Sequence, residues 1–364
     1  MLPYFLLMLL CLFLGYLWKR TGSNRIIQIW LELFLLVLLF LLIGFKYDVG
    51  TDSPNYLRHY LDMSYSYYMY GDMTLRTPEV SHSYLNYLSA VIDGGTLFVY
   101  ICYGAIISFF TLRAASNLSL NPFYFLIVNL PFHIVMLAVS GVRQGAAESI
   151  VVFAVSLLLL KRTKYFALLI LFATTFHSSA LVFLVLVFIN SKTRYMVLAL
   201  LLTLPIMLYF SLNEYGHYIE SNLYNQGIFL RVGFLILNVM IIIRFRKQWE
   251  QLPYNSVIRF NWFIIFSVPL LIGIALLSTT MADRLSYYFI LLSSIPALAL
   301  ISKQRSSFEF IIRNSLFFVS FTSVAIFGYF GNNGPNYFYD SYLYRWVVDG
   351  EFPEIDSSYK IRGG

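Results

Sequence analysis

The chain has 364 residues, of which 59% are hydrophobic and only 12% are charged, and its mean hydropathy is +0.71. Soluble domains carry about 25% charged residues, so this composition excludes a water-soluble protein. The net charge of +7 does not indicate a nucleic-acid partner, because the basic residues form small clusters between apolar runs, as they do where they orient membrane helices.

The first apolar run, MLPYFLLMLLCLFLGYLWKR, has no positive charge before it and no small-residue cleavage site. We therefore expect a retained membrane span, with Lys19 and Arg20 in the cytoplasm. Cys11 and Cys102 both fall within apolar runs, so we expect neither a disulfide framework nor a metal site.

Apolar runs recur along the whole chain, and most are long enough to cross a hydrocarbon core of about 30 Å. The sequence predicts one all-α polytopic membrane domain over residues 1–364, with about 11–13 transmembrane helices. An insertion at 47–95 and a tail at 331–364 are expected on the extracytoplasmic side. The apolar runs lie near 2–18, 26–45, 96–112, 122–139, 144–160, 165–190, 195–212, 228–243, 257–278, 285–302 and 309–330.

The run at 165–190 is either one span or a hairpin of two short helices that meet at His177. With a hairpin, 16 of the 25 Lys and Arg residues lie on the side of Lys19. With one span, only 12 of the 25 do. The positive-inside rule favours the hairpin.

Polar residues open the run that follows the stretch AVSGVRQGAAESI at 138–150. Gln144 and Glu148 are an i,i+4 pair on one helix face, directly after Arg143. One interpretation is that Arg143 extends to the interface with Glu148 as its local partner. The other is that these residues line a cavity, as charges inside spans usually do.

Three other segments place polar residues on the same side of the membrane. Each also has an ordinary structural explanation: a helix start with an interface arginine, a satisfied core histidine and a polar turn. The segments are STTMADRLSYYF with Asp283 and Arg284, TTFHSSA with His177, and FKYDVGTDSPNYLRHYLD with Asp48, Asp52, Arg58 and His59.

Tyrosines are dense in the insertion and in the tail segment NYFYDSYLYRW at 336–346, which includes Tyr337 and Tyr344. Aromatic belts at the membrane interface explain many such residues. These tyrosines lie beside acids and arginines, however, and flat rings with polar edges also suit sugars.

Arginines that face one cavity form a site for phosphate, since a guanidinium binds paired oxygens bidentately and stays charged. We therefore predict that Arg143 and Arg284 bind a diphosphate. The sequence contains no nucleotide, zinc or dinucleotide motif, so we expect no cofactor and a donor already activated in the membrane. A base must then accept a proton from the acceptor hydroxyl, and Asp52, His177 and Glu148 are the candidates. Candidate sugar ligands are Asp48, Arg58, His59, Gln144, Asp283, Tyr337 and Tyr344.

An ordered set of segments between residues 49 and 289 resembles the motif series of EpsG-type polysaccharide polymerases, which are similar in role to the Wzy O-antigen and capsule polymerases. The resemblance implies a glycosyltransferase of the bacterial inner membrane that joins undecaprenyl-diphosphate-linked repeat units at the periplasmic or exterior face. It carries over Asp52, Arg143, His177 and Arg284. The matching segments are VGTDSPNY (49–56), SGVRQGAAESI (140–150), KRTK (161–164), FHSSAL (176–181) and DRLSYYF (283–289).

On this interpretation the partners are the lipid-linked oligosaccharide, as donor and acceptor, the membrane lipid and, optionally, a chain-length regulator. A flippase or transporter of the same lipid-linked sugar is an alternative, although it needs a path open to both sides and usually paired repeats. A ligase or another lipid-linked-sugar glycosyltransferase would differ only in its acceptor. A structural membrane subunit would not need the charges inside its spans.

Overall fold

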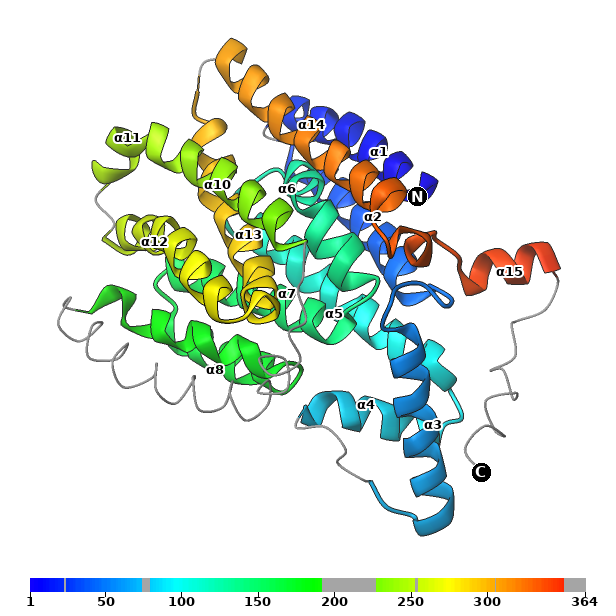
Figure 1. Ribbon diagram of the computed structural model, residues 1–364. Coiled ribbons are helices and arrows are strands. Elements are labelled where there is room, and N and C mark those ends of the chain that lie inside the picture. Colours follow the sequence, from blue (N-terminus) through cyan, green and yellow to red (C-terminus); the bar gives the residue numbers. More distant parts are fainter. Residues whose placement is uncertain (23, 74–78, 192–226, 253–254, 305, 350–364) are drawn as a thin grey trace.

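The computed structural model describes residues 1–22, 24–73, 79–191, 227–252, 255–304 and 306–349. Within these residues the chain is helical, and the sole extended pairing is an isolated antiparallel bridge between Lys46 and Ser341. The predicted all-α class is confirmed (Figure 1).

In the described part of the chain, seven helices are long and apolar enough to cross a membrane. The prediction of a polytopic membrane protein is therefore confirmed. These helices are α1 (Leu2–Arg20), α2 (Arg25–Gly44), α5 (Gly95–Asn117), α7 (Val142–Leu159), α12 (Asn255–Leu277), α13 (Thr279–Ile301) and α14 (Ser306–Phe330).

Two predicted runs form shorter helical elements, and a third cannot be compared with the structure. The run at 122–139 is α6 (Pro122–Asn129) continued by a π-helix, η1 (Leu130–Ala138). Pro131 lacks a backbone N–H, and the helix widens where the usual i→i−4 bond is lost. The run at 228–243 is α10 (Ile228–Arg244), followed by the short α11 (Arg246–Glu250). The run at 195–212 lies outside the described residues.

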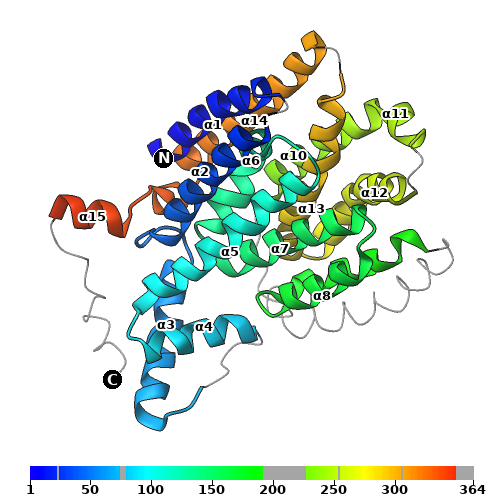
Figure 2. The same cartoon turned by 180° about the vertical axis from the view of Figure 1, so that it is seen from behind.

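The run at 165–190 folds as the predicted hairpin. The helix α8 (Thr163–Thr174) and the 3₁₀ element η2 (Ser178–Asn190) pack against each other and join at Thr175–His177. Both views show the chain reversing at this turn (Figures 1 and 2). His177 therefore lies at the end of two short elements rather than inside one span.

Helices α7 and α13 form the centre of the bundle. About four-fifths of each apolar window is buried, 78% in α7 and 83% in α13, against 22% in α2 and 28% in α12 and α14. The peripheral helices thus expose apolar side chains, as lipid-facing helices do, while α7 and α13 are surrounded by protein. The N-terminal ends of these two helices lie next to each other, since Gln144 of α7 donates to the backbone carbonyl of Arg284 of α13.

The insertion at 47–95, expected as a turn-rich loop, contains two helices, α3 (Ser53–Tyr70) and α4 (Val80–Val91), which project from one end of the bundle (Figures 1 and 2). Pro54 opens α3, and Gly71, with φ +70°, ends it. These are the residue types that favour a helix start and a helix end. The tail returns to this end of the bundle as η3 (Gly334–Tyr337) and α15 (Tyr342–Asp349).

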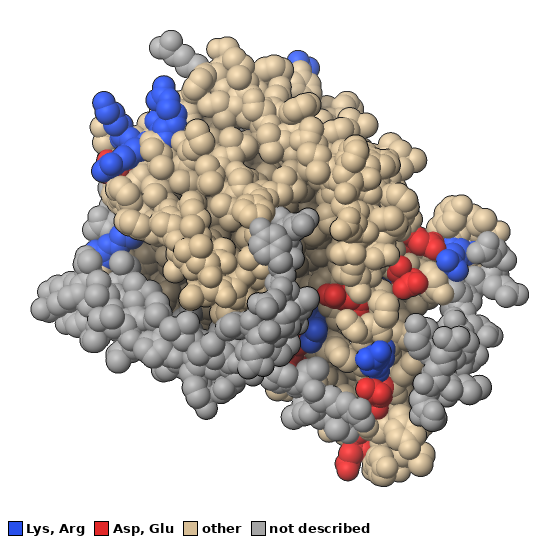
Figure 3. All heavy atoms as spheres, viewed as in Figure 1, with Lys and Arg blue, Asp and Glu red and all other residues tan. Residues whose placement is uncertain are grey.

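Charged residues gather at two ends of the face shown in Figure 3, with a broad uncharged surface between them. One group lies over the α10–α11 end and the other over α3 and α15. This distribution fits an apolar band in lipid between two polar ends.

Helices α2 and α5 cross closely at two glycines. A Cβ placed on Gly104 would lie 2.7 Å from the backbone nitrogen of Gly44 and 3.2 Å from the carbonyl oxygen of Phe40. Small residues allow such close approach between membrane helices. Neither neighbouring atom belongs to a flexible side chain, so the crossing depends on glycine.

We expect Gly104→Val to destabilise the protein by about 1–3 kcal/mol, the cost of overpacking a well-packed interior. Gly273→Val is the matched control, because Gly273 also lies in a membrane helix but has open space around it. The measurement is the melting temperature of each purified variant in the same detergent. Equal melting temperatures would contradict the close crossing.

Candidate functional site

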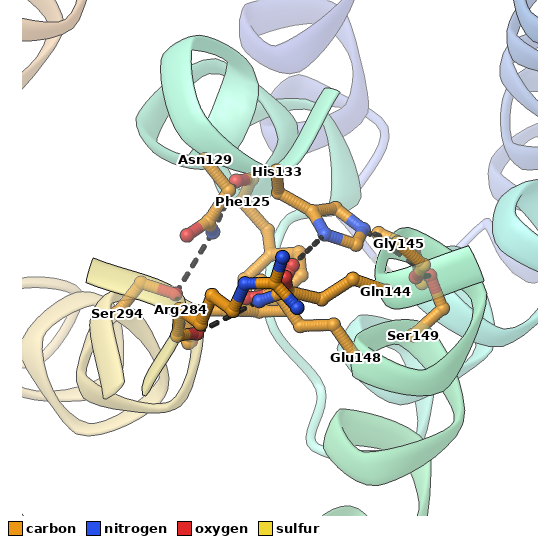
Figure 4. A network of polar contacts seen from close by, with 11 residues as sticks. Phe125, Asn129, His133, Gln144, Gly145, Glu148, Ser149, Arg284 and Ser294 are labelled. Atoms are coloured by element: carbon orange, nitrogen blue, oxygen red, sulfur yellow. Dashed lines mark hydrogen bonds and ion pairs between the residues drawn. The ribbon is translucent and has the colours of Figure 1, made fainter. Parts of the chain in front are cut away.

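The starts of α7 and α13 are joined directly. The side-chain amide of Gln144 donates to the backbone carbonyl of Arg284 at 2.7 Å (Figure 4). Arg143 and Arg284, which are 141 positions apart in the chain, lie in the first turn of α7 and the second turn of α13. A helix N-terminus carries a partial positive charge, and that of α7 adds to the charge of Arg143.

Arg143 has a buried partner. Its guanidinium donates from Nη1 to Oε2 of Glu79, the residue before α4, and lies 5.8 Å from the ring centre of Tyr56. The side chain of Glu79 is 5% exposed, whereas that of Arg143 is 29% exposed. Arg143 is thus anchored from the protein side and keeps part of its surface open.

His177 meets the same carboxylate. Its Nδ1 lies 3.0 Å from Oε1 of Glu79. The first turn of α4 is attached to the α8–η2 turn, because the backbone nitrogen of Ser81 donates to the carbonyl of Thr175 at 3.0 Å and their hydroxyls are 2.6 Å apart. Glu79 is therefore held between α7 and the turn that carries His177.

Asp52 approaches the start of α7 from another direction. It precedes α3, but its side chain does not cap that helix. The hydroxyls of Thr51 and Ser140 are 3.2 Å apart, and Oδ2 of Asp52 lies 3.7 Å from the position that a Cβ on Gly141 would take. The half-buried carboxylate is thus held two residues before Arg143.

These four residues, Asp52, Glu79, Arg143 and His177, form what we call the polar cluster. The structure brings together three of the residues that the resemblance carried over, and the fourth, Arg284, lies on the adjoining helix. The cluster combines a cation suited to phosphate oxygens with two groups able to accept a proton. Within the described residues, no group of three His, Cys, Asp or Glu side chains is placed to hold a metal ion.

Glu148 lies elsewhere, so the interpretation that it is the local partner of Arg143 is wrong. Its side chain is 1% exposed, and Oε2 is 2.6 Å from Nδ1 of the equally buried His133 (Figure 4). Nε2 of His133 in turn lies 2.8 Å from the Thr111 hydroxyl. Glu148 is neither the partner of Arg143 nor a member of the polar cluster, because it points into the bundle instead of toward its end.

If the Glu148–His133 pair is structural, removing either partner should leave the other polar group buried without compensation, at a cost of about 3–5 kcal/mol. We expect Glu148→Ala and His133→Ala each to lower the melting temperature in detergent. The double variant should lose less stability than the sum of the single variants. Additive losses would show that the two side chains do not act as a pair.

Several predicted sugar ligands are engaged within the protein. Gln144 is buried by its bond to Arg284, and Asp283 forms a buried ion pair with Arg231. Tyr337 is 4% exposed, and its ring packs edge-on against Phe327 at 4.7 Å, so it has no free face on which a sugar could stack.

The remaining predicted sugar ligands lie nearer the surface. Nδ1 of His59 is 2.9 Å from Nε2 of His82 on α4, and the side chain of His59 is half-buried. Asp48, Arg58 and Tyr344 are exposed.

Sequence reasoning missed several buried charged or titratable residues, among them Glu79, Arg231 and His133. Arg231 and His133 interrupt apolar runs, the same signal that singled out Arg143 and His177. Glu79 had no such signal, because it follows a polar segment in which an acidic residue is unremarkable. Its importance comes from the packing of α4 against the α8–η2 turn.

The fold and the polar cluster define an integral membrane protein with charged and titratable residues gathered among helix starts at one end of the bundle. In a comparison with protein families, residues 29–343 match the EpsG family, and the chain belongs to this family. The predicted resemblance is thereby confirmed, and all members of the polar cluster lie in the matched region. Membership fits a polysaccharide polymerase in general. Comparisons with curated proteins and with solved structures give no match.

Proposed function

We propose that this protein is a polysaccharide polymerase that transfers a growing glycan from undecaprenyl diphosphate onto the next lipid-linked repeat unit. The observation that carries the proposal is the partly open guanidinium of Arg143, anchored beside two proton acceptors in an EpsG-family chain. A lipid tail can lie among the helices while its diphosphate meets this end of the bundle.

The extracytoplasmic face is supported by where the basic clusters lie along the helices. Helix α7 begins at the polar cluster and ends before the basic segment 161–164, and α10 ends at Arg244, before Arg246 and Lys247. Basic residues of short loops are retained in the cytoplasm. The polar cluster is at the opposite ends of these helices, so it faces the periplasm or the exterior.

In the proposed reaction, a hydroxyl oxygen of the acceptor sugar attacks the anomeric carbon that is bonded to the donor diphosphate. The bond between that carbon and the diphosphate oxygen breaks, and undecaprenyl diphosphate leaves with the electron pair. Negative charge therefore grows on the leaving diphosphate, where preorganised cations stabilise the transition state. Arg143 and Arg284 have this role in our proposal.

The proton of the acceptor hydroxyl goes to a base in the polar cluster. We assign this role to His177, because Nδ1 faces a carboxylate and the other ring nitrogen is left to accept a proton. Asp52 is half-buried beside the start of α7, and in our proposal it binds the acceptor sugar. Glu148 is unsuited to either role, since its buried carboxylate is engaged with His133.

We expect Arg143→Ala and Arg284→Ala each to reduce long-chain glycan by about 10²-fold or more, the usual effect of removing one charge-stabilising donor. Single repeat units should still reach the surface lipid. The measurement is gel analysis of surface glycan from a deletion strain that carries each variant at equal protein level. Arg246→Ala, at the other end of the bundle, is the control and should give a normal ladder. Repeat units that accumulate on the cytoplasmic face would instead indicate a flippase.

Arg143→Lys should restore little polymerisation, because an ammonium group cannot bind paired oxygens bidentately. The same gel assay, with wild-type and Arg143→Ala strains as the two reference lanes, measures the recovery. A full ladder from Arg143→Lys would mean that Arg143 is only an interface anchor.

A further inference from the structure

Glu79 contacts the two residues to which the proposed reaction assigns the leaving group and the proton. One carboxylate oxygen, Oε2, accepts from Arg143, and the other, Oε1, lies 3.0 Å from Nδ1 of His177. We propose that Glu79 is a positioning residue that orients Arg143 toward the leaving diphosphate and His177 toward the acceptor hydroxyl. This assignment rests on the proposed function.

The setting of Glu79 suits a fixed connector. Its side chain is 5% exposed and belongs to the residue immediately before α4. The two contacts between Ser81 and Thr175 fix that helix start against the turn before His177. Arg143 reaches Glu79 from α7, so the three side chains come from three different elements. Each carboxylate oxygen has its own partner, so the plane of the carboxylate is set by both contacts.

Glu79 does not itself act as the base. Burial by itself raises the pKa of this carboxyl group, but the His177 hydrogen bond and the Arg143 charge outweigh burial and lower the pKa to about 2. The carboxylate therefore stays ionised at any pH that the cell experiences. It accepts hydrogen bonds throughout the reaction and neither takes up nor releases a proton.

The carboxylate of Glu79 biases which ring nitrogen of His177 carries the proton. An ionised carboxylate can only accept a hydrogen bond, so its position 3.0 Å from Nδ1 favours a proton on that nitrogen of the neutral ring. The lone pair is then on Nε2. A glutamine at position 79 offers an N–H as well as an oxygen, and it no longer favours this tautomer.

The contact affects Arg143 differently. Glu79 accepts a hydrogen bond from Nη1 of Arg143, and the guanidinium has further N–H donors. The exposed part of the Arg143 side chain remains open. Without the carboxylate, Arg143 keeps its charge and still attracts a diphosphate, but its orientation is lost. Loss of Glu79 should therefore reduce turnover without weakening substrate binding.

The test uses membranes that contain the full-length protein and, as substrate, the lipid-linked repeat unit extracted from a polymerase-deletion strain. For Glu79→Gln we expect kcat to fall by about 10²–10⁴-fold, the range of general acid–base catalysis, with KM unchanged or lower. Glu79→Asp keeps the charge on a shorter side chain and should recover part of the activity.

Glu309→Gln is the matched control. Glu309 is also a buried carboxylate shared by two cations, Lys19 at 2.7 Å and Arg313 at 2.9 Å, but it lies at the other end of the bundle. It should give normal kcat per folded molecule. The positioning role is overturned if Glu79→Gln raises KM at an unchanged kcat, or if Glu79→Asp is as inactive as Glu79→Gln.

A second measurement does not depend on activity. Nitrogen-15 NMR of histidine-labelled protein, with the His177 signals identified by their loss in His177→Ala, should show a neutral ring protonated at Nδ1 in the wild type and an altered pattern in Glu79→Gln. A wild-type ring protonated at Nε2 would overturn the inference whatever reaction the protein performs. The expected NMR pattern together with a normal glycan ladder from Arg143→Ala would support Glu79 as the residue that orients His177 and overturn the proposed function alone.

Discussion

A charged or polar group inside an apolar bundle has to be paired, because it has no water to compensate for its burial. In this protein the constraint is met by long-range pairs that join different helices. Arg143 meets Glu79, Glu148 meets His133, and Arg231 meets Asp283. Each pair fixes how two elements pack, so the positions of the buried charges and the packing of the helices determine each other.

The polar contacts of the bundle fall into two groups that differ in exposure. The network of Figure 4 around His133 and Glu148 is closed, with both side chains 1% exposed, and it joins α7 to η1. The polar cluster, in contrast, leaves Arg143 partly open at 29%. A closed network stabilises one arrangement of helices, whereas a partly open one can exchange contacts with a substrate. This difference is why we place the chemistry at the helix starts and not at the centre.

The insertion between the second and third long helices has a larger part than that of a connecting loop. Its helices α3 and α4 deliver Asp52 and Glu79 to the starts of α7 and η2, where the arginine and the histidine lie. The tail also returns to this end, since Gly50 donates to the carbonyl of Asn336 at 2.7 Å. The tail therefore packs beside the segment that carries Asp52, although the residues of the polar cluster all come from the first half of the chain.

The sequence by itself determined the class of the protein and much of its topology. The length of an apolar run and the placement of basic residues are local properties, and they govern how each segment inserts into a membrane. The sequence also identified Arg143, His177 and Asp52, whose residue types are conspicuous where they occur. Only the tertiary structure decided which charges are partners, since pairing depends on how helices far apart in the chain pack. Glu79 is ordinary in its own segment, and the spacing of Glu148 from Arg143 suggests a pair that the direction of Glu148 on α7 rules out.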